Sequence, residues 1–241
     1  MPWSFIDTRS GLRQRLRVRA AGDLINEQSF IYLEALVAGR PRGVEDSVIL
    51  RAAADVMGRV GPAGLTLAAV AGEVGLVAGT LVQRFGSKHG LLVALAEQSV
   101  RDADARYERV RTEQASALAA LMTLAAESTA PMTTPKTFAN HLAFLCMDLT
   151  DPQLHEHALA VHQAQGRAIE ALLTAAVSSG ELRAGTDTAA LTGSVQAIIA
   201  GAGLTWALDR QGTLPQRLRQ EISTLVSAHV PSSDNPDLEE S

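Results

Sequence analysis

The sequence predicts an all-helical protein. Alanine and leucine, which favour helices, are abundant along the 241 residues, whereas aromatic residues make up only 4%. Apolar side chains recur with the spacing of buried helix faces, and no segment shows the alternation that is typical of a half-buried strand. Hydrophobic residues make up 46% of the chain, which is enough for a sizeable core. A chain of this length can form one large domain or two small ones.

Residues 65–88 carry the most informative pattern. The spacing i, i+3, i+4, i+7 of one buried helix face is occupied by Leu67, Val70, Ala71 and Val74. Thr66 stands just before this run, where its hydroxyl can accept a free backbone N–H of the first turn. Gly75 ends the run, because glycine reaches the left-handed cap without steric cost, and a second short helix fits residues 78–84. Two short helices across a glycine-containing turn predict a helix-turn-helix, whose second helix can enter the major groove of DNA.

This pattern resembles the DNA-binding signature of the TetR-type (TetR/AcrR) transcriptional regulators. The matching positions, in order, are Thr66, Val70, Ala71, Gly75, Gly79-Thr80-Leu81, Phe85 and Ser87-Lys88. They follow a first helix, expected over residues 45–60, with the matching residues Ile49, Ala53, Val56, Met57 and Gly61. The resemblance implies a three-helix DNA-binding domain over residues 44–90 and a helical effector-binding and dimerisation domain over residues 91–230.

The expected DNA contacts lie in and around the second short helix. Gln83 can pair with adenine and Arg84 with guanine in the major groove. Lys88, at the start of the next helix, could hold a phosphate together with that helix's N-terminal N–H groups. The predicted DNA-binding residues are Thr66, Thr80, Gln83, Arg84 and Lys88. The alternative is that the polar residues simply face solvent and that Arg84 pairs with a nearby acid.

Three positions depart from the usual pattern of the family. Val77 stands where Ser usually caps the reading helix, so this helix start is weaker by about 1 kcal/mol. Val82 stands where Tyr usually touches the DNA backbone, and Arg84 stands where Tyr or His is usual. Residues 44–100 also carry only four basic against five acidic side chains. We therefore expect modest affinity for DNA from charge alone.

The rest of the chain is predicted to form helices that are separated by capping residues and prolines. A long helix should begin at Lys88, capped by Ser87, and run to about residue 112. Asp151-Pro152 reads as an N-cap with proline at the first helical position, and Thr213 with Pro215 opens the last helix. The further helices are expected over residues 114–129, 135–149, 152–179, 187–209 and 214–229.

The two ends of the chain fall outside this pattern. Residues 1–43 hold Arg9, Arg13, Arg15, Arg17 and Arg19, then a possible helix from Asp23 to Ala38. Three interpretations remain open: a flexible arm that reaches DNA, an extra helix packed on the body, or an inert extension. The polar, acidic residues 231–241 are expected to be disordered.

A dimer interface is expected in the last two helices. No charge falls between Asp187 and Asp209, so this stretch imitates a membrane span. Its threonines, glycines and alanines instead favour a buried or interface helix. The predicted interface residues are Ile198, Gly201, Ala202, Trp206, Leu218, Ile222 and Leu225. The alternative is that these helices form the core of a single chain.

The family resemblance also implies an effector cavity among the middle helices. The predicted ligand-binding residues are Met122, Phe138, His141, Phe144 and Leu145, with Met132 and Met147 as further candidates. Such side chains are equally compatible with plain core. Few charges occur in these helices, which favours a mostly apolar effector.

Other classes of function find no support in the sequence. No catalytic triad, phosphate-binding glycine loop or cysteine cluster is present, so we expect neither an enzyme nor a cofactor or metal site. The single Cys146 and the lack of a signal-like start favour the cytoplasm. The sequence therefore predicts a homodimeric, ligand-responsive repressor that binds a near-palindromic DNA operator. The alternative is a dimeric helical ligand-binding or interaction protein whose DNA binding has decayed.

Overall fold

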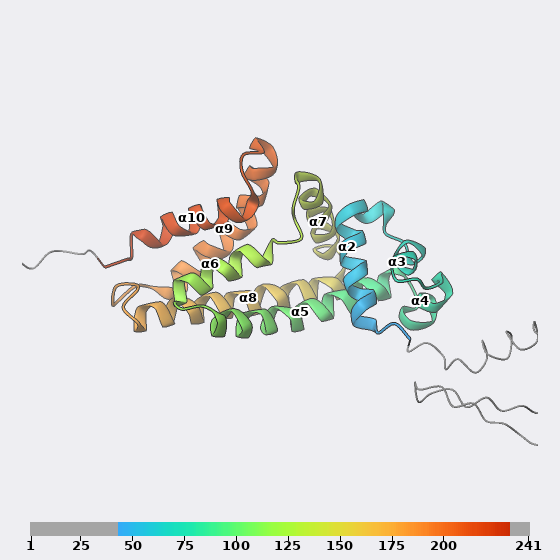
Figure 1. The fold of residues 1–241 in the computed structure, drawn as a ribbon, viewed down its shortest axis with the longest axis horizontal. Coiled ribbons are helices and arrows are strands. Elements are labelled where there is room, and N and C mark those ends of the chain that lie inside the picture. The colour runs from blue at the N-terminus through green and yellow to red at the C-terminus, as the bar shows by residue number, and fades with distance from the viewer. Residues whose placement is uncertain (1–42, 232–241) are drawn as a thin grey trace, which may run out of the picture. The chain divides into compact units, whose positions relative to one another are not determined.

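A computed structural model describes residues 43–231, so the predictions for residues 1–42 and 232–241 lie outside the described residues (Figure 1). In this part of the chain every regular element is a helix, as predicted. The helices are α2 (Asp46–Gly64), α3 (Leu67–Glu73), α4 (Ala78–Phe85), α5 (Lys88–Glu113), α6 (Ala117–Ser128), α7 (Pro135–Asp148), α8 (Pro152–Ser178), α9 (Thr188–Asp209) and α10 (Leu214–Ser227).

Most helices start within one residue of the prediction, and side chains cap several of them locally. Helix α6 begins at Ala117 rather than at residue 114, because Ser116 caps it. The hydroxyl oxygens of Thr66 and Ser87 accept the N–H groups of Ala69 and Gly90, each at 3.1 Å. The Asp151 carboxylate accepts two N–H groups at the start of α8, and Thr213 forms a capping box at the start of α10. Each cap satisfies donors that a helix start otherwise leaves free.

The end of α2 differs from the prediction. We expected the helix to stop at Val60, but one further turn follows a kink at Gly61, whose φ is 69°. Pro62 starts this turn, where its missing N–H costs little, and Gly61 supplies a backbone conformation that other residues adopt only with strain. The kink turns the last residues of α2 toward the start of α5.

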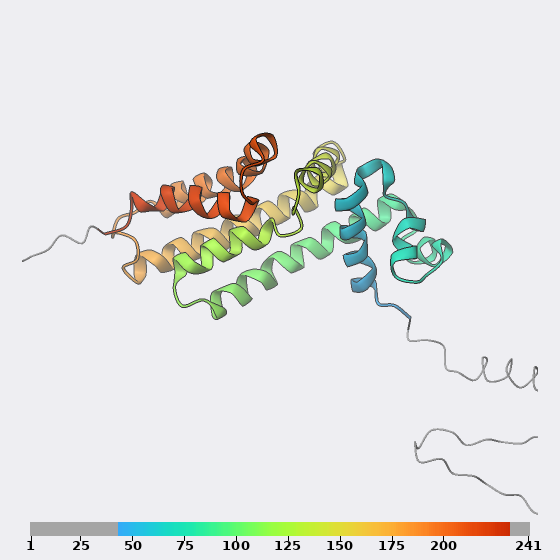
Figure 2. The same ribbon diagram turned by 45° about the horizontal axis from the view of Figure 1, so that its top comes forward.

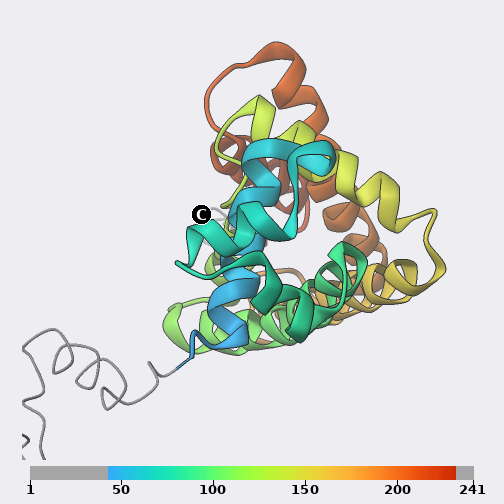
Figure 3. The same ribbon diagram turned by 90° about the vertical axis from the view of Figure 1, so that its right-hand side faces the viewer.

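Helices α2, α3 and α4 pack around the first turns of α5 and form the helix-turn-helix domain (Figures 1 and 3). Their shared core includes the fully buried Ile49, Val70, Leu81 and Leu91. Phe144 of α7 also belongs to this core, so the helix-turn-helix domain and the helices that follow it are packed together. We call α5–α10 the C-terminal domain.

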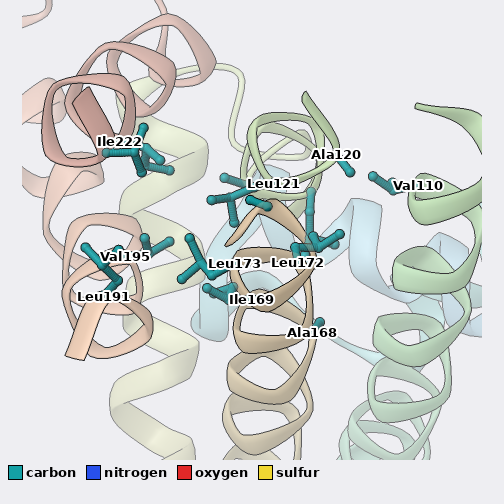
Figure 4. Close-up of a cluster of buried hydrophobic side chains, with 14 of the residues drawn as sticks. Val110, Ala120, Leu121, Ala168, Ile169, Leu172, Leu173, Leu191, Val195 and Ile222 are labelled. Atoms are coloured by element: carbon teal, nitrogen blue, oxygen red, sulfur yellow. The ribbon is translucent and has the colours of Figure 1, made fainter. Parts of the chain in front are cut away.

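The C-terminal domain is a helical bundle in which α5 and α8 lie side by side (Figure 2). Helices α6 and α9 pack on this pair, and α10 packs on α6 and α9. Its main core combines side chains from five helices, including Val110, Leu121, Leu173, Val195 and Ile222 (Figure 4). A smaller cluster around Trp206 joins α7, α9 and α10. Both clusters include side chains of α9, so this helix takes part in each core.

Candidate functional site

Helix α4 presents an exposed polar edge, as the reading helix of a helix-turn-helix must. Leu81 anchors it, with no exposed surface, while Gln83 is exposed and Thr80 is half-buried. Gly75, at φ 67°, makes the turn between α3 and α4. Val77 begins α4 without a side-chain oxygen to cap it, and 71% of Val77 is exposed. Thr80 and Gln83 are therefore accessible to a partner molecule, as residues that read the major groove of DNA must be.

Arg84 is bonded to other parts of the protein, and its predicted contact with guanine stays a prediction. Its guanidinium donates to the backbone carbonyl of Val44 and to the Asp46 carboxylate, the latter at 2.9 Å. These bonds tie the end of α4 to the beginning of α2. The pairing of Arg84 with a nearby acid, which was the alternative expectation, is present in the structure.

Lys88 is likewise engaged within the protein. Its Nζ donates to the Pro62 carbonyl at 2.6 Å, and its side chain is half-buried. A free carbonyl at the end of a helix attracts a cation, so this bond secures the last turn of α2. An ammonium has three donors, and phosphate binding by Lys88 stays a prediction for the two that remain.

The face that includes α3 and α4 is close to neutral. The Glu73 carboxylate pairs with Arg59 of α2 at 2.5 Å, and Thr66 is exposed with its hydroxyl proton still available to a phosphate. Val82 adds apolar surface beside Gln83, with 49% of its area exposed. Such a face would contact DNA through hydrogen bonds and apolar contacts more than through charge.

A cavity of about 490 Å³ lies between α5, α7 and α8, with contributions from α2, α6, α9 and α10. Four of the five predicted ligand-binding residues line it: Phe138, His141, Phe144 and Leu145. Met122 is not among the described lining residues, because it packs against the main core instead. Met132 lines the cavity, while Met147 is not among the described lining residues. The size suits a small organic molecule.

Several polar lining residues were missed by the sequence reasoning. Arg106 of α5 and His157 and Gln165 of α8 line the cavity, as does Asp148 at the end of α7. The signal for Asp148 was present, since it is the one carboxylate of α7 and stands one turn after Phe144. Nothing in the sequence marked the residues of α5 and α8, because only the packing of these helices brings them to one space.

Two titratable groups in the cavity wall are perturbed by burial. Burial lowers the pKa of His141, whose Nε2 is buried without a hydrogen-bond partner among the described residues. Burial, and secondarily the nearby Asp151 carboxylate, raises the pKa of Asp148 to about 6. The two pKa values move in opposite directions for one reason: burial disfavours the charged form, which is the protonated histidine and the deprotonated aspartate.

The cavity wall also touches the helix-turn-helix domain. Met57 of α2 contributes to the lining, and a Cβ on Gly58 would lie only 3.0 Å from Nε2 of His141. The amide of Asn140 donates to the Gly58 carbonyl at 2.8 Å. Helix α7 thus forms one wall of the cavity and also contacts α2 through Asn140 and His141.

Comparison with known protein families identifies the family to which this chain belongs. Residues 49–95 match the family described as "Bacterial regulatory proteins, tetR family", and residues 143–222 match "Tetracyclin repressor-like, C-terminal domain". The chain belongs to the TetR family. Regulators of this family bind DNA and small molecules as dimers. No curated protein matches the sequence.

Solved structures with the same fold support the TetR assignment. A TetR regulator from Haloarcula marismortui superposes with a TM-score of 0.64 at 17% identity, covering 77% of this chain and 98% of that one. FadR from Bacillus subtilis, in complex with stearoyl-CoA, gives 0.57 at 20% identity, covering 76% and 98%. SmeT, the repressor of a Stenotrophomonas maltophilia multidrug efflux pump, gives 0.57 at 18% identity, covering 83% and 97%.

In this TetR chain, four of the predicted interface residues belong to the core of the protomer. Ala202, Trp206, Leu218 and Ile222 are buried inside the protomer, so the cores of one chain already take their surface. Their burial agrees with the alternative expectation of a single chain's own core, and the dimer interface itself stays a prediction. Ile198, Gly201 and Leu225 are half-buried and keep some accessible area.

Another face of α9 is exposed instead. Its residues are Ala189, Gly193, Ala197, Ala200, Leu204 and Leu208. Leu208 is 84% exposed. By length and composition α9 could span a membrane, with a mean hydropathy of 1.3, and 28% of the tested segment is buried. Its other side packs against α7, α8 and α10 within the bundle, which leaves one uncharged face open.

Proposed function

We propose that this protein is a ligand-responsive transcriptional repressor that binds a near-palindromic operator as a homodimer. A small effector in the cavity would release it. The observation that carries the proposal is the position of α7, which lines the cavity and holds α2 of the helix-turn-helix domain through Asn140. The cytoplasm, where the DNA is, is its proposed location.

Dimerisation follows from the size of the reading module. One helix-turn-helix makes too few contacts for tight specific binding, and two-fold dimers place two reading helices about one helical turn of DNA apart. The exposed face of α9 offers alanines and glycines that allow close helix approach, with Leu204 and Leu208 supplying apolar area. We propose this face, rather than the buried residues of α10, as the centre of the interface.

Release by effector requires two states with different effector affinity. A ligand between α5, α7 and α8 that displaces α7 would displace α2 with it, because the two helices share a hydrogen bond and the contact between His141 and Gly58. Moving α2 moves α4, since Arg84 ties α4 to the start of α2. A dimer whose reading helices change their spacing no longer fits two successive major grooves.

The test is operator selection from random duplex DNA with the purified full-length protein, followed by gel shifts of the enriched duplex. Enrichment of an inverted repeat, bound specifically between about 50 and 200 mM salt, supports the proposal. Ala197→Arg should convert the dimer to a monomer and abolish the shift. Ala105→Arg, the same change at an exposed position of α5, should affect neither property.

The alternative, a dimeric ligand-binding or interaction protein with decayed DNA binding, is favoured by one observation. Both cations of the helix-turn-helix segment, Arg84 and Lys88, are bonded to other parts of the protein. Enrichment of no sequence, with binding that disappears by about 200 mM salt, would select this alternative.

A further inference from the structure

Asp148 is a carboxylate in an unusual place. It ends α7 and lines the cavity beside apolar neighbours such as Phe144 and Leu145. It is half-buried, and within residues 43–231 it accepts no hydrogen bond from another side chain. No lysine, arginine or histidine nitrogen of those residues lies within 4.0 Å of its oxygens. A partly buried charge without a partner is costly, so its retention needs an explanation.

Three features of the surroundings of Asp148 favour the binding of a positive charge there. Apolar packing removes water from the carboxylate, and the second carboxylate, Asp151, stands three residues further on. The C-terminal end of α7 adds the negative pole of the helix dipole. Asp151 itself is already satisfied, because it accepts the N–H groups of Gln153 and Leu154 and pairs with His89 at 3.0 Å. Among residues 43–231, Asp148 therefore keeps its charge without a basic partner within 4.0 Å.

Arg106, the basic residue with a permanent charge among the described lining residues, lies at the opposite end of the cavity. The pair of His89 and Asp151 places the end of α7 beside the first turn of α5. Arg106 follows His89 by 17 positions on the same helix, which is about 25 Å along its axis. Its long side chain can also carry the charge toward water. Arg106 therefore does not neutralise the charge of Asp148.

We propose that the effector is an amphiphilic cation, with an ammonium or quaternary ammonium group held at Asp148 and an apolar body along the cavity. This inference rests on the proposed function of the cavity as the effector site. Phe144 stands one turn before Asp148 on the same side of α7, where its ring can face the same cation. The apolar body would lie against Phe138, Leu142 and Val161. The same field disfavours an anionic head group at this end of the cavity.

Three ligands that share one tail test the proposal: decyltrimethylammonium, decanol and decanoate. Their dissociation constants are measured by calorimetry on the full-length protein at neutral pH. We expect the cation to bind about tenfold more tightly than the alcohol, because a partly buried charge pair outweighs a neutral hydrogen bond. Decanoate should bind most weakly. Asp148→Asn should bring the cation and the alcohol to within about twofold, while Glu156→Gln, an exposed acid of α8, should preserve the preference.

Equal binding of cation and alcohol, or a preference that survives Asp148→Asn, overturns the proposal. Failure of all three probes to bind also overturns it. Gel shifts of the selected operator duplex on the same samples report the DNA-binding function independently. A protein that binds the duplex but ignores the charge of the probe therefore refutes the effector class alone.

Discussion

The Asn140 side-chain amide donates to the carbonyl oxygen of Gly58 at 2.8 Å and so joins α7 to α2. In a regular helix that carbonyl would accept the N–H of residue 62, which is a proline and has none. Gly61, next to the break, leaves room for the contact, since a Cβ there would lie 2.7 Å from Oδ1 of Asn140. The break in the first helix of the helix-turn-helix domain thus creates the acceptor that the C-terminal domain binds.

Asn140→Ala should loosen this junction. It leaves the Gly58 carbonyl without its side-chain partner, which we expect to cost about 1–3 kcal/mol in the free energy of unfolding. Urea unfolding measures this cost. Lys136→Ala, an exposed change one turn earlier in α7, is the matched control and should stay within about 0.5 kcal/mol of the wild type. Equal effects of the two changes would show that the hydrogen bond contributes nothing.

Gly203→Ala should damage the cavity from the side of α9. A Cβ at Gly203 would lie 2.2 Å from the ring of Phe138, so the ring must move. Overpacking of this kind costs about 1–3 kcal/mol, and the displaced ring would fill ligand space. Gly72→Ala in α3 is the control, because a Cβ there meets no described atom within 4 Å and should stabilise the helix by about 0.5–1 kcal/mol. Thermal unfolding of both variants distinguishes these opposite signs.

The helices and their caps could be predicted because their signals are local. The side chains of Thr66 and Ser87 bond to N–H groups three residues ahead, so a short stretch of sequence contains both partners. The helix-turn-helix followed for the same reason, since glycine at position 75 serves a turn between neighbouring helices. The extra turn of α2 was missed, because its support comes from Lys88, 26 residues after Pro62.

The candidate site was predictable only where one helix face determines it. Phe138, His141, Phe144 and Leu145 lie on α7 and were found together. The partner of Arg84 was not, because Asp46 lies 38 residues earlier and any of several acids could have met it. Periodicity in α10 identified a buried stripe but could not tell which surface would bury it. In the fold that surface belongs to the same chain.

Gln83 and Arg84 should separate DNA recognition from stability. Gln83→Ala removes an exposed side chain and should weaken binding to the selected operator by about 1–3 kcal/mol, with thermal stability unchanged. Arg84→Met removes the tie from α4 to α2 and should lower stability by about 1 kcal/mol. The slope of affinity against salt should stay the same in Arg84→Met, since this cation is already paired. A marked loss of slope would show that Arg84 leaves Asp46 to contact phosphate.

Asp148→Asn should stabilise the unliganded protein in a pH-dependent way. Burial raises the pKa of Asp148 to about 6, above the value near 4 of a free carboxyl group, so the fold favours the protonated form. The stability that this preference contributes is complete below about pH 4 and is lost as the pH rises through 6. The variant should therefore gain most above pH 6 and progressively less toward pH 4. Solvent screening of a half-exposed group reduces the expected gain to about 1 kcal/mol.

Urea unfolding of Asp148→Asn and wild type at about pH 5 and pH 8 measures this difference, with Glu156→Gln as the exposed control. An equal gain at both pH values would assign the effect to packing rather than to charge. A cationic ligand should reverse the order, because it stabilises the ionised carboxylate of the wild type and has no counter-charge in the variant. The wild type would then be less stable than the variant when empty and gain more stability on binding the cation. This is the behaviour expected of a residue that is retained for its ligand at the expense of the fold.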